Sequence, residues 1–233
     1  MYIKKIKLKN FRNYKQQQIE LDPNINLFFG ENAQGKTNIL EAVFLCAIGK
    51  SFRAKKEREL INLEEENASI EIEYEKKDRE GIIRIDLTPK KEIYLNGIQQ
   101  NKLSDILGTI NLVMFCPDDI EIIKSGPDKR RRFLNIMISQ LRPRYVYCLN
   151  MYLKALEQRN IYLRQIANEG ASIELLDIWD EKLVEYANEV YQYRQEFIKK
   201  IKEKISKIHL EVTQGQEEIK MKYISDCTTN ARF

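Results

Sequence analysis

The sequence contains little histidine and cysteine for its length. Of its 233 residues, one is a histidine, His209, and four are cysteines: Cys46, Cys116, Cys148 and Cys227. The cysteines lie far apart and form no C-x-x-C pair, so no zinc site of the usual spacing is predicted. A Ser-His-Asp or Cys-His catalytic site would have to use His209, near the end of a charged helical stretch, which argues against that chemistry. We interpret the cysteines as reduced, buried thiols of a cytosolic protein.

Long hydrophobic runs are also missing. The longest apolar run, Ala42 to Ile48, is far shorter than a membrane span. Residues 2–10 are rich in lysine, but no apolar segment of a signal peptide follows them. These absences predict a cytoplasmic protein with no membrane partner.

The composition suits a polar, folded protein. Apolar residues make up 43% of the chain, enough for a packed core, and charged residues make up 32%. The length allows one large or two small domains. The net charge of +4 does not by itself indicate a nucleic-acid partner, so that question depends on local clusters of charge.

A phosphate-binding loop is the clearest motif. The pattern G-x-x-x-x-G-K-T is formed by the run Gly30-Glu31-Asn32-Ala33-Gln34-Gly35-Lys36-Thr37. An apolar run at 25–29 predicts a strand before it, and residues 38–45 predict a helix after it. The glycines allow the backbone to approach a phosphate, and the start of the helix favours an anion. We therefore predict that Lys36 reaches the β- and γ-phosphates and that the Thr37 hydroxyl ligates Mg²⁺.

Several other runs predict β-strands in the first half of the chain. Residues 2–9 indicate an edge strand, and Ile19 with Leu21 indicates a second strand. Residues 69–75 alternate strictly between apolar and polar side chains, as in a half-exposed strand. Further strands are predicted at 82–87, 92–95 and 110–116, with a hairpin turn at Asn96-Gly97.

After Pro117 the pattern becomes helical. Apolar residues that recur every three or four positions predict helices over 128–141, 144–168 and 174–208. We expect the aromatic stripe of the last helix to pack against neighbouring helices, and residues 209–224 to return to strand. The predicted organisation is an α/β lobe at 1–117 that carries the phosphate loop, a helical lobe at 118–226 and a polar tail at 227–233.

Five motifs occur together at spacings typical of one family. They are Leu8–Tyr14 (LKNFRNY), Phe29–Ala42 around the phosphate loop, Gly49–Arg53 (GKSFR), Pro117–Asp119 (PDD) and Gly126–Leu134 (GPDKRRRFL). With these motifs the chain resembles the RecF family, bacterial recombination and replication-repair ATPases related to Rad50 and SMC proteins. The Asn-Phe-Arg opening is shared with Rad50-like proteins, and the GKSFR, PDD and GPDKRRRFL motifs are much more specific to RecF. The resemblance covers nearly the whole chain.

The resemblance implies a fold, cofactors and partners. The fold is α/β, a P-loop ABC-ATPase-like mixed β lobe followed by an α-helical lobe, and the cofactors are ATP and Mg²⁺. Residues 30–38, Asn38 included, would bind the nucleotide, with Arg12 and Asn13 nearby. Such proteins bind DNA at gaps, single-stranded or in gapped duplex, help RecR and RecO to load RecA, and form an ATP-dependent homodimer.

The acidic residues that ATP hydrolysis requires are not found among the motifs of this sequence. RecF-like proteins run on well beyond this length, and the resemblance places their ABC signature and Walker B acids there. No apolar strand ending in Asp-Asp or Asp-Glu follows residue 134, and no Ser-x-Gly-Gln signature is present. Asp118-Asp119 follows the predicted strand at 110–116, but the resemblance places this pair at the junction with the helical lobe, which disfavours the alternative that it is a Walker B pair. We therefore expect an N-terminal, incomplete part of the ATPase, with at most weak nucleotide affinity and negligible turnover.

Lysine and arginine gather in three places. The first cluster follows the phosphate-loop helix and is predicted to contact DNA, with a solvated surface as the alternative: Lys50, Arg53, Lys55, Lys56 and Arg58. The second, around Gly126-Pro127, could contact DNA, the helical lobe or a partner subunit: Lys124, Lys129, Arg130, Arg131 and Arg132. The third, at 199–207, is interpreted as a solvated helix surface. No base-reading motif is visible, so any DNA binding is expected to be directed by the structure or the backbone of the DNA.

Two other classes of protein share some of these features. A metabolic kinase or transferase acting on a small molecule can carry the same phosphate loop, but the Asn-Phe-Arg opening and the helical lobe argue against it. A purely structural SMC-like coiled coil would need longer helices with sustained heptads, which do not occur here.

Overall fold

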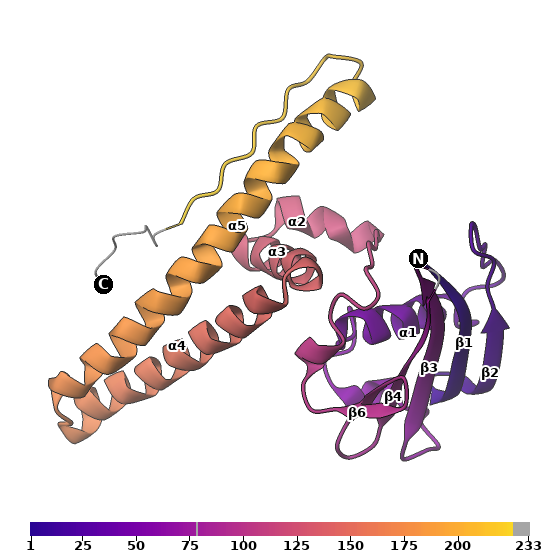
Figure 1. Ribbon diagram of the computed structural model, residues 1–233, viewed down its shortest axis with the longest axis horizontal. Helices are drawn as coiled ribbons and strands as arrows, with labels where there is room; N and C mark the ends of the chain where they lie inside the picture. The colour runs from indigo at the N-terminus through magenta and orange to yellow at the C-terminus, as the bar shows by residue number, and fades with distance from the viewer. Residues whose placement is uncertain (78, 226–233) are drawn as a thin grey trace. The chain divides into compact units, whose positions relative to one another are not determined.

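The computed structural model describes residues 1–77 and 79–225 (Figure 1). These residues form two compact units, one from Met1 to Ile120 and one that begins at Glu121. The division lies close to the predicted boundary after residue 117, and the extents of the two lobes stay predictions. The predicted tail at 227–233 lies outside the described residues.

The first unit is built on a six-stranded antiparallel sheet. In spatial order its strands are β2 (Tyr14–Glu20), β1 (Tyr2–Phe11), β3 (Ala68–Lys76), β4 (Arg79–Leu87), β5 (Glu92–Leu95) and β6 (Ile98–Gln100). The prediction of an edge strand at 2–9 is wrong, because β2 folds back and pairs with the outer side of β1. The predicted hairpin turn is confirmed: Asn96 and Gly97 both have positive φ and join β5 to β6.

One face of this sheet is covered by helix α1 (Lys36–Ile48) (Figure 1). Side chains alternate along β3, so that Ile70 and Ile72 point into the core while their polar neighbours point to the other face. Helix α1 is buried along most of its length, including Leu45 and Cys46. It ends at Gly49, whose left-handed conformation lets its N–H donate to the Leu45 carbonyl at 2.7 Å. The core of the unit therefore fixes the helix that follows the phosphate loop.

Two predicted strands do not form. Residues 25–29 and 110–116 belong to no strand of the described chain, so these predictions are wrong. Leu27 and Phe29 are 81% and 85% exposed, and Val113 and Phe115 are 83% and 88% exposed. A strand needs a second strand to pair with, and neither run pairs with the sheet, whose edge strands are β2 and β6. Apolar character and strand propensity were therefore not sufficient to predict that these two runs form strands.

The second unit is helical, which confirms the three predicted helices. Three-residue and four-residue turns accompany the longer helices: η1 (Glu57–Leu60), η2 (Leu103–Asp105) and η3 (Pro117–Ile120) in the first unit, and α2 (Glu121–Lys124) and η4 (Ile173–Leu175) in the second. The long helices are α3 (Pro127–Leu141), α4 (Pro143–Glu169) and α5 (Leu176–Val212). A proline occupies the first position of both α3 and α4, where its missing N–H costs nothing. The prediction that 209–224 return to strand is wrong, because α5 continues to Val212 and no strand follows within the described residues.

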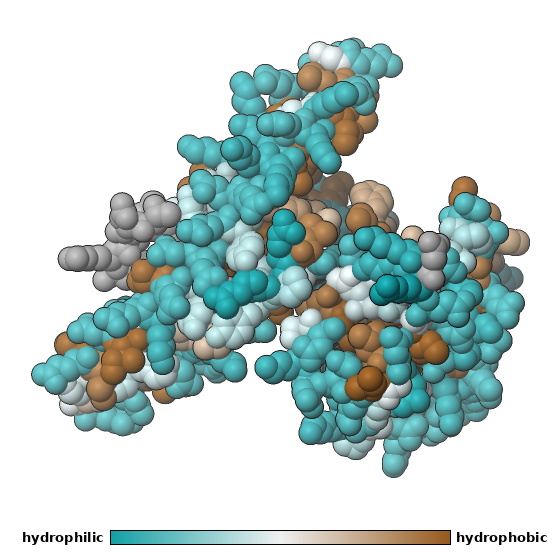
Figure 2. All heavy atoms as spheres, in the orientation of Figure 1, coloured by the Kyte–Doolittle hydropathy of each residue, from teal (hydrophilic) through white to brown (hydrophobic). Residues whose placement is uncertain are grey.

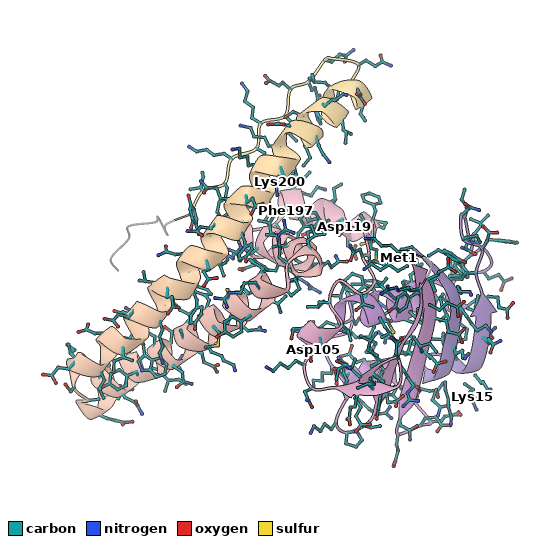
Figure 3. The ribbon with its side chains drawn as sticks, viewed as in Figure 1. Met1, Lys15, Asp105, Asp119, Phe197 and Lys200 are labelled. Carbon is teal, nitrogen blue, oxygen red and sulfur yellow. The ribbon has the colours of Figure 1, made fainter. Side chains whose placement is uncertain are left out.

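Aromatic residues hold the helices of the second unit together. Buried Tyr145 of α4 makes an edge contact with Tyr193 of α5, with ring centroids 5.7 Å apart. Phe197 packs against the same cluster, and Lys200, labelled beside it in Figure 3, extends from the next turn and pairs with Glu196. The predicted packing role of the α5 aromatic stripe is therefore confirmed for these residues.

Hydrophilic residues cover most of the face shown in Figure 2, with smaller hydrophobic patches among them. Within the described residues, no helix has the length and apolar character needed to cross a membrane.

Two glycines with the same left-handed backbone test the packing around α1. A Cβ on Gly49 would lie 1.7 Å from Leu103 Cδ1, whereas a Cβ on Gly97 would meet nothing within 4 Å. We expect Gly97→Ala to cost about 1 kcal/mol from backbone strain alone, and Gly49→Ala to cost at least about 2 kcal/mol because Leu103 must also move. Chemical denaturation followed by far-ultraviolet circular dichroism measures both variants. Equal losses for the two would contradict the packing described here.

Candidate functional site

The phosphate loop is curled. Three of its residues have positive φ: Gly30 at 141°, Ala33 at 66° and Gly35 at 102°. The Gly35 carbonyl accepts hydrogen bonds from the backbone N–H groups of Asn38 (2.7 Å) and Ile39 (3.2 Å) at the start of α1. No side chain caps this end of the helix, and the loop from Gly30 to Gln34 is exposed. The positive end of the helix dipole thus faces an accessible loop, an arrangement that suits an anion.

Glycine is required at the last bend of the loop. A Cβ on Gly35 would lie 2.7 Å from the Tyr14 hydroxyl oxygen and 2.8 Å from Asn13 Oδ1. The β1–β2 turn therefore lies directly against the loop. The shape of the loop depends on this contact as well as on its own glycines.

The amine of Lys36 folds back over the loop. Its Nζ donates to the Gly30 carbonyl at 2.8 Å and to the Glu31 carbonyl at 2.5 Å. Its positive charge is thereby held at the mouth of the curled backbone, where a phosphate oxygen can replace a carbonyl as its partner. The loop, the helix start and this amine together fit a phosphate group.

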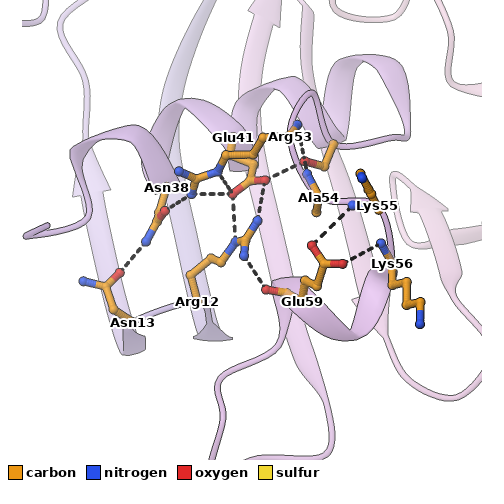
Figure 4. A network of polar contacts seen from close by, with 10 residues as sticks. Arg12, Asn13, Asn38, Glu41, Arg53, Ala54, Lys55, Lys56 and Glu59 are labelled. Atoms are coloured by element: carbon orange, nitrogen blue, oxygen red, sulfur yellow. Dashed lines mark hydrogen bonds and ion pairs between the residues drawn. The ribbon is translucent and has the colours of Figure 1, made fainter.

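A buried carboxylate lies on the same helix. Glu41 is fully buried and accepts from Arg12 Nε at 2.9 Å and Arg12 Nη2 at 2.8 Å, a two-point pairing. It also accepts from Arg53 Nη2 at 2.8 Å and from the Ser51 hydroxyl at 2.5 Å (Figure 4). Burial raises the pKa of Glu41, but hydrogen bonds from Arg12, Arg53 and Ser51 outweigh it, so its pKa is lowered and the group is ionised at neutral pH.

The residues predicted near the nucleotide come together around this carboxylate. Arg12 has positive φ, 54°, and its Nη1 donates to the Glu59 carbonyl at 2.5 Å. Asn38 Nδ2 donates to Asn13 Oδ1 at 2.7 Å, which ties α1 to the β1–β2 turn. Their roles toward a ligand stay predictions. Since its guanidinium is occupied by Glu41 and Glu59, we interpret Arg12 first as a residue that holds the site together.

A cleft of about 830 Å³ lies beside the network. Its lining combines polar groups from the β1–β2 turn, α1 and the segment after it: Arg12, Asn13, Lys15, Asn38, Arg53 and Asn62, among others. Ile61 and Leu63 also line the cleft, so it offers apolar surface beside its polar and charged groups. One of the polar groups is Asn38, the residue after Thr37, so the cleft can hold a polar ligand that extends from the phosphate loop.

Among the described residues, no group of three or more His, Cys, Asp or Glu side chains could hold a metal ion. Thr37 is exposed at the first turn of α1, so its hydroxyl is accessible to a metal that arrives with a phosphate ligand. The prediction that Thr37 ligates Mg²⁺ thus depends on a bound phosphate.

The basic residues predicted to contact DNA divide into two groups. Lys50, Lys55, Lys56 and Arg58 are exposed around the loop that follows α1. Arg53, in contrast, turns its guanidinium toward Glu41 and Asn38. Its predicted contact with DNA stays a prediction, but its side chain lies at the helix of the phosphate loop.

Sequence reasoning missed Glu41 and Ser51. The available signal was a single carboxylate inside the apolar run of the α1 helix, with an arginine in the motif before it and another in the motif after it. A lone charge in an apolar helical run indicates a buried ion pair.

Comparisons with known proteins found similar sequences and similar solved structures. The model of the AAA ATPase domain family matches residues 1–231. The DNA replication and repair protein RecF of Acetivibrio thermocellus is 44% identical over 96% of this chain and 61% of its own length, and that of Clostridium kluyveri is 44% identical over 99% and 63%. A solved structure of the recombination mediator protein RecF with ATP, in the RecFOR pathway, has a TM-score of 0.88 at 39% identity and covers 91% of this chain and 58% of that one. The chain thus spans less than two thirds of the length of these relatives.

The charge of Glu41 can be tested through the pH dependence of stability. Its folded-state pKa is lowered, so its stabilising contribution is present above its unfolded pKa, about 4.3, and is lost as the pH falls through the folded value. We expect Glu41→Gln to lose about 2 kcal/mol at pH 7, below the usual cost for a fully buried pair because Arg53 is 39% exposed. The difference from the unchanged chain should shrink below about pH 4.

Urea denaturation at a series of pH values measures this, with circular dichroism for the whole chain and fluorescence of Trp179 for the second unit. Trp179 should report no change, because it lies outside the first unit. A pH-independent difference between Glu41→Gln and the unchanged chain would show that the carboxylate is not charged in the fold.

Proposed function

Because this chain belongs to the AAA ATPase domain family and is similar to RecF proteins over nearly its whole length, we propose that it forms the phosphate-binding part of an ATP-dependent DNA-binding protein of replication and recombinational repair. The observation that carries the proposal is the curled loop at 30–37, closed by Gly35 against Asn13 and Tyr14 and covered by the Lys36 amine. Similarity to RecF over nearly the whole chain supports the assignment of this loop to ATP.

Each residue of the loop has a proposed task. The backbone amides of Gly30 to Gly35 surround the phosphates, and Lys36 provides a positive charge beside them. Thr37 supplies a hydroxyl to Mg²⁺, and Asn13 and Asn38 line the adjacent cleft. Bound Mg²⁺ and ATP would supply the charges that bring the loop, α1 and the β1–β2 turn into one rigid arrangement.

The exposed lysines after α1 are the proposed DNA contacts. Lys50, Lys55, Lys56 and Arg58 form a basic surface without base-reading motifs, which favours contact with the phosphate backbone. We propose that the whole protein, acting with RecR and RecO, uses such contacts at single-stranded or gapped DNA when RecA is loaded. ATP then acts as a ligand that favours a dimeric, DNA-bound state over the monomer.

Nucleotide binding tests the proposal directly. We expect Lys36→Ala to weaken the binding of a fluorescent ATP analogue to this chain at least about tenfold, because a charge-assisted hydrogen bond to phosphate is lost. Lys90→Ala, a change of an exposed lysine in the turn between β4 and β5, should bind as the unchanged chain does. Turnover should be negligible in all three proteins. Rapid Mg²⁺-dependent hydrolysis that Lys36→Ala abolishes would contradict the expectation that the catalytic acids are missing.

Salt dependence tests the DNA contacts. The double change Lys55→Glu and Lys56→Glu should weaken binding equally across DNA sequences and lower the slope of log affinity against log salt by about 2. Lys202→Glu with Lys204→Glu makes the same change in net charge on the surface of α5 and should leave the slope unchanged. If both double variants behave alike, the effect is one of net charge and the loop is not the DNA contact.

A further inference from the structure

The loop that follows α1 is attached to that helix through a hydroxyl and a carboxylate. Ser51 Oγ donates to Glu41 Oε1 at 2.5 Å. The same oxygen accepts from the backbone N–H groups of Arg53 at 3.0 Å and Ala54 at 2.8 Å. Ser51 therefore shapes the loop, and Glu41 holds Ser51 in place.

The carboxylate also reaches toward the phosphate loop. Arg53 donates to Glu41 Oε2 through both Nε (3.1 Å) and Nη2 (2.8 Å), and Nη2 also bonds the side-chain oxygen of Asn38. Asn38 directly follows Thr37. A displacement of the first turn of α1 would thus also displace Arg53 and the backbone of the loop that carries it.

A second connection leaves the carboxylate through Arg12. Arg12 Nη1 donates to the carbonyl of Glu59, whose side chain accepts from the backbone N–H groups of Lys55 (3.3 Å) and Lys56 (3.2 Å) (Figure 4). Both ends of the loop that carries these exposed lysines are therefore connected to the same buried group on α1.

We propose that Glu41 is a positioning residue that couples the phosphate loop to the basic loop at 50–58. It contacts neither ligand. Its carboxylate holds Ser51, Arg53 and Arg12 against α1, so that the first turn of α1 and the backbone of the basic loop move as one body. The coupling of nucleotide to DNA in this statement rests on the proposed function, whereas the coupling of the loop to α1 does not.

Amide hydrogen exchange tests the attachment of the loop. Glu41→Gln replaces an acceptor by an amide that must face arginine donors, and Ser51→Ala removes the hydroxyl but leaves both arginine pairs. Both should raise the exchange rates of the Arg53 and Ala54 amides by about tenfold, the equivalent of one hydrogen bond, while amides within α1, such as Leu45 and Cys46, stay protected. Ser51→Thr keeps a hydroxyl and should restore protection.

Glu64→Gln is the matched control. Glu64 lines the cleft beside the Glu41 network, but its side chain is 72% exposed and pairs with Lys15 at the surface. It should leave the exchange of the loop unchanged. If Glu41→Gln unfolds the unit, Ser51→Ala still decides whether the hydroxyl that Glu41 holds shapes the loop. Unchanged exchange at Arg53 and Ala54 in Ser51→Ala would overturn the proposal.

Anisotropy of labelled DNA, with and without Mg²⁺ and ATP, tests the coupling itself. We expect nucleotide to change the dissociation constant of DNA about fivefold in the unchanged chain and by less than about twofold in Glu41→Gln, with nucleotide binding retained. A nucleotide effect that persists in Glu41→Gln would overturn the coupling. If nucleotide has no effect on DNA binding by the unchanged chain, the proposed ATP switch is refuted, and the coupling to DNA is refuted with it. The attachment of the loop to α1 is then still decided by hydrogen exchange.

Discussion

A carboxylate that is removed from water needs donors for its lone pairs, and Glu41 obtains them from Arg12, Ser51 and Arg53. These donors come from different segments, the turn after β1 and the loop after α1. Since a buried negative charge is stable only when such donors are in place, the two segments are drawn to the same side of α1. The arrangement around the phosphate loop depends on this one group.

The β1–β2 turn, which carries Arg12, also contacts the phosphate loop at Gly35. Asn13 and Tyr14 lie so close to Gly35 that any side chain there would collide with them. The loop is therefore supported by the sheet through its β1–β2 turn and by the core through α1. The basic loop at 50–58 is attached to the same turn and the same helix. A phosphate bound in the phosphate loop would therefore contact backbone that is connected to the basic loop.

The local patterns of the sequence predicted much of the fold. Period-two alternation identified β3, and helical periodicity identified α3, α4 and α5, because each pattern places apolar side chains on one face of its element. The strands predicted at 82–87 and 92–95 also form, as β4 and β5. The runs at 25–29 and 110–116 have the composition of strands but remain outside the sheet. Pairing is a property of two segments, so composition within one segment could not decide it. For the same reason β1 was misplaced at an edge.

The sequence by itself determined the phosphate loop, since the spacing of its glycines, Lys36 and Thr37 is a local property of eight consecutive residues. It also determined the family, through motifs spread along the chain. Only the tertiary structure decided what surrounds the loop: that Glu41 is buried, that Arg53 faces α1, and that Ser51 joins helix and loop. These contacts join residues 10 to 29 positions apart, and they form because a buried charge selects its partners by distance in space, not in sequence.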